Sequence, residues 1–221
     1  MSEIHHPETS HAQAETSHAK AEHPEAFSSL PLVPALLDNL ESLGYLAMTP
    51  IQAASLPPIL RGRDVIGQGK TGSGKTAAFG LGLLSALDVS RFQVQALVLC
   101  PTRELADQVA EELRRLARML ANVKILALCG GAPLGPQLNS LSHGAHVVVG
   151  TPGRIEEHLR KGSLDLSSLA VLVLDEADRM LDMGFQAALE AIVAATPTTR
   201  QTLLFSATYG DNIRPVAERM L

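Results

Sequence analysis

The chain has 221 residues, of which 46% are hydrophobic and 3% aromatic, with no tryptophan. This length and composition predict one large domain, or a domain and a half, with an aliphatic core. They exclude a membrane-spanning class, because no apolar run approaches the ~20 residues that cross a bilayer. The formal charge of -5 at pH 7 excludes nucleic-acid binding driven by net positive charge, so any such site must be a local patch. The N-terminus lacks the apolar centre of a signal peptide, which predicts a soluble cytoplasmic protein.

Residues 1–26 are poor in aliphatic side chains and carry most of the negative charge, with five acids and one lysine. The stretch TSHAQAE at 9–15 is followed at once by TSHAKAE at 16–22. We expect a disordered tail over 1–26 and a folded domain over 27–221. Five of the eight histidines lie in the tail. Metal binding is the alternative to a solvated tail, but no cysteine or carboxylate spacing sets a coordination geometry.

From residue 27 onward, short apolar runs alternate with helical patterns. The apolar runs lie at 64–67 (DVIG), 96–100 (ALVLC), 123–129 (VKILALC), 146–150 (HVVVG), 171–174 (VLVL) and 202–206 (TLLFS). Helical patterns begin at Lys75, Arg103, Gly153 and Phe185. Strands that alternate with helices predict an α/β fold, a parallel sheet with helices on both faces, in which ligands bind at the carboxyl ends of the strands. Cys100 and Cys129 each end an apolar run and are predicted to be reduced core thiols.

The stretch GKTGSGKT at 69–76 follows a predicted strand and opens a predicted helix. It fits the phosphate-binding loop pattern, in which glycines turn backbone N–H groups toward an anion at a helix N-terminus. We expect Lys75 to reach the β- and γ-phosphates and Thr76 to offer its hydroxyl to Mg²⁺. The alternative for Lys70 is a solvated loop charge. The residues expected to contact the nucleotide here are Gly69, Lys70, Thr71, Gly72, Ser73, Gly74, Lys75 and Thr76.

The stretch VLVLDEAD at 171–178 places three carboxylates at the end of a predicted buried strand. We expect Asp175 to support Mg²⁺, partly through water, and Glu176 to orient or activate the attacking water. Asp178 is expected to point elsewhere and to accept hydrogen bonds from a coupling element. The alternative is a helix N-terminus that carries acids to complement its dipole.

These motifs, together with PTRELA at 101–106, GG at 130–131, TPGR at 151–154 and SAT at 206–208, resemble the first RecA-like domain of a DEAD-box RNA helicase. The resemblance covers residues 27–221. It implies a P-loop NTPase that binds ATP and Mg²⁺ and couples ATP hydrolysis to local unwinding of an RNA duplex. In detail the motifs are most similar to a bacterial ribosome-assembly member, which implies ribosomal RNA as the substrate. Gly69 departs from the family, in which most members have alanine there.

The resemblance also implies roles that spacing alone does not indicate. GYLAMTPIQ at 44–52 is similar to the Q motif, in which Gln52 would read the adenine edge. Phe27 stands 17 residues before Gly44, where family members place an aromatic that packs on adenine. Without the resemblance, Gln52 is an ordinary helix residue and Phe27 is a core anchor.

The motifs at the other strand ends imply contacts with the sugar–phosphate backbone of single-stranded or structured RNA. The residues concerned are Pro101, Thr102, Arg103, Gly131, Thr151 and Arg154. An equal alternative is that Arg103 and Glu104 hold their own loop together. Ser206 and Thr208 would bond Asp178 and couple hydrolysis to RNA binding; the alternative is a strand that ends in small polar residues.

The resemblance ends with the first domain at residue 221, so we expect this chain to lack the family's second RecA-like domain and its arginine fingers. We therefore expect a monomeric ATP-binding half that binds nucleotide weakly, hydrolyses it slowly and unwinds nothing alone. Two other functions stay open: a stand-alone nucleotide-binding module, and a P-loop enzyme that acts on DNA.

Overall fold

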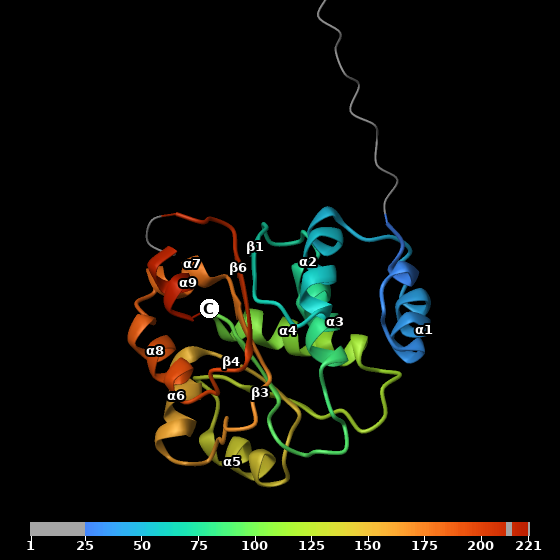
Figure 1. Cartoon of the computed structure of the whole chain (residues 1–221). Helices are drawn as coiled ribbons and strands as arrows, with labels where there is room; N and C mark the ends of the chain where they lie inside the picture. The colour runs from blue at the N-terminus through green and yellow to red at the C-terminus, as the bar shows by residue number, and fades with distance from the viewer. Residues whose placement is uncertain (1–24, 211–213, 221) are drawn as a thin grey trace, which may run out of the picture.

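The computed structural model describes residues 25–210 and 214–220 (Figure 1). The predicted tail therefore lies outside the described residues, except for its last two. Among the residues that are described, every helix is too short or too polar to span a bilayer.

A six-stranded sheet forms the centre of the domain, and all its strand pairs are parallel. The strand order is β1-β6-β5-β2-β4-β3. The strands are β1 (Val65–Gln68), β2 (Ala96–Leu99), β3 (Ile125–Leu128), β4 (Val147–Gly150), β5 (Val171–Asp175) and β6 (Gln201–Ser206). Every residue of β2, β4 and β5 is buried, as expected for strands covered on both faces. The predicted α/β class is confirmed.

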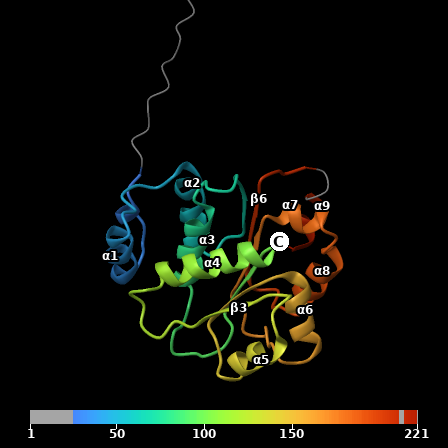
Figure 2. The ribbon, with the colours of Figure 1, turned by 180° about the vertical axis from the view of Figure 1, so that it is seen from behind.

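Helices cover both faces of this sheet (Figures 1 and 2). They are α1 (Pro34–Ser42), α2 (Pro50–Leu60), α3 (Lys75–Ser85), α4 (Arg103–Leu116), α5 (Leu134–Ser142), α6 (Pro152–Arg160), α7 (Ala177–Asp182), α8 (Gln186–Ala194) and α9 (Arg214–Met220), with a short 3₁₀ helix at Phe27–Ser29. Side chains alternate along each strand, so Val173 of β5 packs with α1–α4 while Leu172 and Leu174 pack with α6–α9. The domain therefore has two aliphatic cores, one on each face.

All four predicted helices are present, but the pattern missed α1, α2, α5, α7 and α9. Helix α2 contains Pro57 and Pro58 in its interior, where proline normally ends a helix. It persists because its buried side chains, Leu56 and Ile59 among them, pack in the core shared with α3. Cys100 and Cys129 are free and buried, as predicted. Burial raises the pKa of the Cys129 thiol to about 11.

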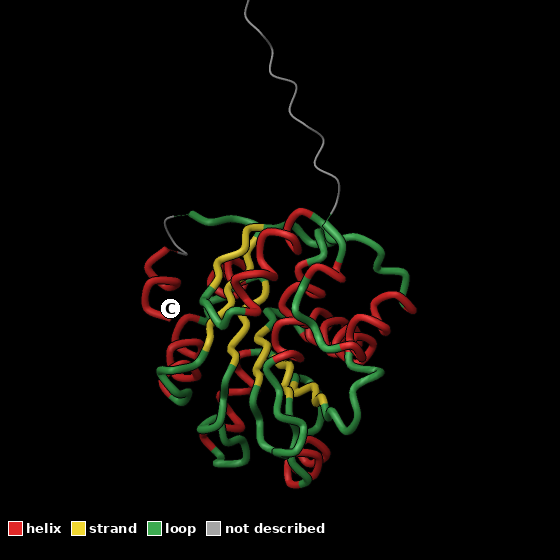
Figure 3. The backbone as a smooth tube through the Cα atoms, turned by 45° about the vertical axis from the view of Figure 1, so that its right-hand side comes forward, coloured by secondary structure: helices red, strands yellow, loops and turns green. Residues whose placement is uncertain are grey.

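Because the strands are parallel, their carboxyl ends lie along one edge of the sheet (Figure 3). The P-loop leaves β1 there and the acidic segment leaves β5, with β6 between them. The PTRELA and TPGR segments leave β2 and β4 at the same edge. The topology thus brings together motifs that are up to 137 positions apart in the chain, from Gly69 to Ser206. The Gly69 amide donates a hydrogen bond to the Ser206 carbonyl at 2.9 Å.

Candidate active site

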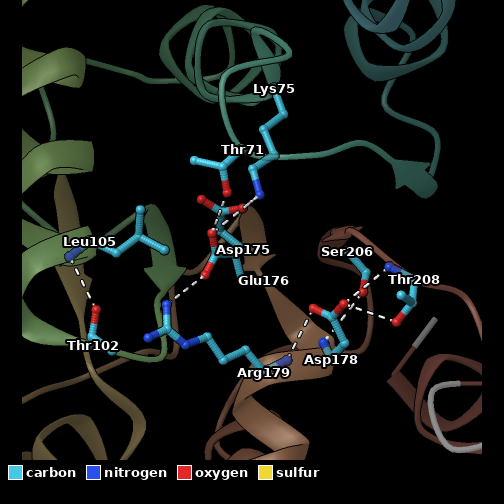
Figure 4. Close-up of polar contacts among 10 residues, drawn as sticks. All are labelled: Thr71, Lys75, Thr102, Leu105, Asp175, Glu176, Asp178, Arg179, Ser206 and Thr208. Carbon is cyan, nitrogen blue, oxygen red and sulfur yellow. Dashed lines mark hydrogen bonds and ion pairs between the residues drawn. The ribbon is translucent and has the colours of Figure 1, made fainter.

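The P-loop lysine meets the first carboxylate of the acidic segment. Lys75 is the first residue of α3, and the residue before it, Gly74, adopts a left-handed conformation at φ 93°. The Lys75 ammonium Nζ lies 2.8 Å from Asp175 Oδ1 and 3.9 Å from Glu176 Oε1 (Figure 4). Thr71 of the loop donates a hydrogen bond to Glu176 Oε1 at 3.0 Å. The two motifs therefore form one site.

Several polar atoms of this site are buried without sufficient partners. Apart from the Lys75–Asp175 ion pair, Lys75 Nζ, both carboxylate oxygens of Asp175 and Ser73 Oγ have no hydrogen-bond partner among the described residues. Burial raises the pKa of Asp175 above its usual value, and the Lys75 charge opposes that rise without cancelling it. Unpaired donors and acceptors of this kind are costly in an apolar interior. A polyphosphate for Lys75 and Ser73, with a divalent cation for Asp175, would satisfy them, so the residues present fit both groups.

Glu176 has an unusual backbone conformation. It lies in the left-handed region at φ 54° and ψ 52°, which few residues other than glycine adopt. Its carboxylate is held on the other side by Arg179 Nη1, 3.3 Å from Oε2. Because of this backbone conformation, the Glu176 side chain points toward the P-loop, where its carboxylate accepts a hydrogen bond from Thr71 (Figure 4). Backbone strain of this kind is typical of functional sites.

A cavity of about 340 Å³ extends from this ion pair toward α2 and α4. One end is lined by the phosphate and acidic residues Lys75, Thr76, Asp175 and Glu176. The other end is lined by Tyr45 and Gln52, and by the face of α4 that includes Glu112. A cavity with one lysine and two carboxylates at one end, and an aromatic ring and an amide at the other, suits a nucleotide that carries a divalent cation.

Gln52 has both halves of its amide engaged within the chain. It is 2% exposed, its Oε1 accepts a bond from the Thr49 amide at 2.9 Å, and its Nε2 donates to the Gly74 carbonyl at 3.1 Å. A β-carbon at Gly74 would lie 2.6 Å from Gln52 Nε2, so glycine is required at this contact. Gln52 therefore ties the start of α2 to the P-loop and is not an ordinary helix residue.

The aromatic that lines the cavity is Tyr45, a residue to which the motifs assign no role. Phe27 is 3% exposed, packs edge-on against Tyr45 with ring centroids 6.1 Å apart, and is absent from the cavity lining. The geometry favours the core-anchor interpretation of Phe27. The only signal for Tyr45 was its place inside GYLAMTPIQ, seven positions before Gln52.

The third carboxylate of the segment points away from the cavity, as predicted. Asp178 Oδ2 accepts two bonds from Thr208, from its amide and its hydroxyl, both at 3.0 Å (Figure 4). The Asp178 amide donates to Ser206 Oγ at 3.4 Å. Burial alone would raise the pKa of Asp178, but these bonds lower it below its usual value. The expected contact exists, and its coupling role stays a prediction.

Residues 49–216 match the DEAD/DEAH box helicase family. The chain belongs to that family. It is 62% identical over 196 residues to the ATP-dependent RNA helicase DbpA of Escherichia coli, and 49% identical over 195 residues to the DEAD-box ATP-dependent RNA helicase CshA of Bacillus cereus. These matches cover 88% of this chain but only 43% and 37% of the relatives, so the chain spans less than half of their length.

A solved structure of a DEAD box protein from Methanococcus jannaschii is also similar, with a TM-score of 0.85 and 38% sequence identity. The match covers 89% of this chain and 53% of that one. The predicted RecA-like fold of this helicase family is therefore confirmed.

Three further helicase motifs lie along the same edge of the sheet. Thr102 caps α4 by accepting a bond from the Leu105 amide at 3.3 Å (Figure 4). The side chain of the next residue, Arg103, is 52% exposed. Thr151 Oγ1 accepts a bond from the Gly130 amide at 3.3 Å. A β-carbon at Gly131 would lie 4.0 Å from Arg103 Nη1, so these motifs form one surface.

Two of the predicted RNA-binding residues have little solvent-exposed area. Pro101 is buried, and the Arg154 side chain is only 11% exposed. Lys70 of the P-loop is exposed and, among the described residues, makes no ion pair within 4.0 Å, which fits its alternative interpretation as a solvated charge.

Proposed function

We propose that this chain is the ATP-binding RecA-like domain, over residues 27–221, of an ATP-dependent RNA helicase that uses ATP hydrolysis to separate short RNA duplexes. The observation that carries the proposal is the Lys75–Asp175 pair at 2.8 Å, with buried polar atoms around it that lack partners. Family membership and the similarity to proteins named RNA helicases support it.

The residues of the cavity have distinct roles in this proposal. Lys75 and the P-loop amides bind the β- and γ-phosphates, and Gln52 with Tyr45 contacts the base. Thr76 and Asp175 would hold Mg²⁺, which supplies positive charge against the phosphate oxygens when it is bound. Glu176 accepts a proton from, or orients, the attacking water. To do so it must leave the bond with Thr71 that occupies it in this structure.

The RNA would lie across the surface formed by Thr102, Arg103, Gly131 and Thr151. Hydroxyls, one guanidinium and close-approach glycine suit contacts with phosphate and ribose, which carry no sequence information. Binding would therefore have little sequence specificity in this domain. Ribosomal RNA as the substrate stays a prediction from the resemblance.

Full activity would require a second RecA-like domain, as in the longer helicases that this chain resembles. Arginine fingers of the kind such a domain supplies accelerate phosphoryl transfer by ~10³–10⁵. We propose that this domain alone binds nucleotide weakly and turns it over slowly.

The test is the steady-state ATPase rate of the full-length protein, measured with and without a single-stranded RNA and with DNA of the same sequence. We expect RNA to raise the rate and DNA not to. Glu176→Gln should keep ATP binding and lower turnover by about 10²-fold or more, because general-base catalysis contributes that much. Glu190→Gln, an exposed change on α8, is the control.

Equal stimulation by DNA would favour a DNA-acting enzyme, and no stimulation by either would contradict the helicase function. Normal turnover in Glu176→Gln would show only that the base is assigned wrongly.

A further inference from the structure

A network of polar side chains lies beneath the Gly130–Gly131 turn. It consists of Gln137 on α5, Arg154 and His158 on α6, and Ser163 in the turn after α6, and we call it the α5–α6 network. Gln137 is 9% exposed and His158 is fully buried. No part of the nucleotide site contains these residues, and polar groups buried this deeply need a complete set of partners.

Gln137 is the centre of this network, and both polar atoms of its amide are hydrogen-bonded. Its Nε2 donates to the Cys129 carbonyl at 3.0 Å. Its Oε1 accepts one bond from Arg154 Nη1 at 3.0 Å and another bond with His158 Nε2 at 2.9 Å. Because the amide nitrogen faces the Cys129 carbonyl, the oxygen must face His158, and His158 must therefore carry its proton on Nε2.

His158 is held as a neutral imidazole. Its Nδ1 lies 2.8 Å from Ser163 Oγ, and the one proton of this hydroxyl is shared between Nδ1 and the His158 carbonyl, 3.1 Å away. Burial lowers the pKa of His158 below its usual value, the Arg154 and Lys161 charges lower it further, and Glu157 opposes them. A neutral ring completes the network without placing a second cation beside Arg154.

The Arg154 guanidinium bonds to other groups of the protein. Nη1 and Nη2 both donate to the Ala132 carbonyl at 3.0 Å, and Nε lies 3.1 Å from Glu157 Oε2. Together with the bond to Gln137, this leaves little of the group to meet a ligand. Arg103 differs, because its side chain is 52% exposed and its ion pair with Asp107 is long, at 3.6 Å.

The network holds the two ends of the glycine turn. Gln137 binds the carbonyl just before Gly130, and Arg154 binds the carbonyl just after Gly131. Between them the Gly130 amide is bonded to Thr151, and Gly131 is in a left-handed conformation at φ 77°. The position of this turn relative to α6 therefore depends on Gln137 and Arg154.

We propose that Arg154 is a positioning residue, which with Gln137 and His158 shapes the Gly130–Gly131 turn for a nucleic-acid backbone, while Arg103 supplies the positive charge that contacts phosphate. This inference rests on the proposed RNA-binding function and changes the role of Arg154 from direct contact to support.

Salt dependence separates the two roles. A cation that contacts phosphate releases counterions, so its loss lowers the slope of log affinity against log salt concentration by about 0.7 for a single strand. Loss of a positioning group weakens binding but leaves that slope unchanged, because the number of phosphate contacts is the same.

The experiment measures binding of a short oligouridylate to the full-length protein by fluorescence anisotropy, at several salt concentrations and with a non-hydrolysable ATP analogue. Arg154→Lys keeps the charge but cannot make the paired bonds to Ala132, and Gln137→Met keeps the side-chain length without the amide.

We expect each of these two variants to weaken binding about tenfold, the effect of losing a charge-assisted hydrogen bond, with the slope of log affinity against log salt unchanged. Arg103→Gln should weaken binding and lower the slope. Arg160→Gln, at the exposed end of α6, controls for loss of a surface charge.

Unfolding temperatures and nucleotide affinities show whether each variant is folded. If Gln137→Met does not fold, the affinity and salt slope of Arg154→Lys alone test the inference. Wild-type affinity in Arg154→Lys would overturn the inference and leave the proposed function intact. A third variant, Arg154→Gln, removes the charge. A salt slope lowered in Arg154→Gln as much as in Arg103→Gln, together with wild-type affinity in Gln137→Met, would overturn the inference too. Failure of the wild-type protein to bind the oligouridylate would instead contradict the proposed function.

Discussion

Tyr45 shows how a single residue connects the end of the cavity that Gln52 lines to α4. Its hydroxyl donates to Glu112 Oε1 at 2.6 Å, and Glu112 in turn pairs with Arg115 at 2.8 Å. The pKa of Tyr45 is raised from 10.0 to about 12, first by burial and then by the bond to Glu112. Glu112 therefore determines where the ring stands in the cavity.

This pair has a pH dependence with a definite sign. Because the folded pKa of Tyr45 lies above its unfolded value, its contribution to stability is complete below pH 10 and is lost as pH rises through about 12. The chain has two tyrosines and no tryptophan, so in a Tyr209→Phe background an ultraviolet absorbance titration reports Tyr45 alone. We expect Glu112→Gln to lower its pKa part of the way toward 10, since burial remains. An unchanged titration curve would show that Glu112 does not hold the hydroxyl.

At the scale of elements, the packing of α2 against α3 depends on a missing side chain. Gly82 lies in the middle of α3, and a β-carbon there would overlap Ile59 Cγ2 of α2. Ile59 is 2% exposed and β-branched, so it cannot move aside easily. Close approach of these two helices keeps Gln52 beside the P-loop, because Gln52 is the third residue of α2 and α3 begins at Lys75.

We expect Gly82→Ala to lower the free energy of unfolding by about 1–2 kcal/mol, because overpacking outweighs the better helix propensity of alanine. Gly135→Ala in α5 is the matched control, since a β-carbon there meets nothing within 4 Å. That control should be neutral or stabilising by up to about 1 kcal/mol. Chemical denaturation measures both, and a Gly82→Ala protein as stable as the control would contradict the close-packing argument.

The element scale also shows where sequence patterns fail. Continuous apolar runs predicted all six strands, because strands covered on both faces have no polar side. Helix α4 was predicted because it has one apolar and one charged face. Helix α2 was missed because Pro57 and Pro58 lie inside it, and packing against α3 keeps it helical. Helix α1 is a short helix that begins at Pro34 and packs against α4.

At the scale of the whole molecule, the buried Lys75–Asp175 pair makes stability depend on ligand. ADP with Mg²⁺ at about a hundredfold above its Kd should stabilise the protein by about 2.7 kcal/mol, which raises the unfolding temperature by roughly 5–10 °C. Thermal unfolding with and without ligand measures this shift. Lys75→Ala should abolish the shift, and GDP should produce less of it than ADP if Gln52 and Tyr45 read the base.

Lys75→Ala also leaves Asp175 buried without its partner, so its own unfolding temperature will change. The measurement therefore compares the change in unfolding temperature that the ligand produces in each protein, and not the unfolding temperatures themselves. A full shift in Lys75→Ala would contradict nucleotide binding at the P-loop.

The sequence by itself determined the α/β class, the P-loop, the acidic segment and their shared edge of the sheet. These follow from local chemistry: glycines before a helix, carboxylates after a buried strand, and parallel strands whose carboxyl ends must coincide. Only the tertiary structure decided that Tyr45 and not Phe27 lines the cavity, that Gln52 is bonded to Gly74, and that Arg154 turns inward to Ala132. Each of these is a choice among partners distant in the chain, which packing settles and a local pattern does not contain.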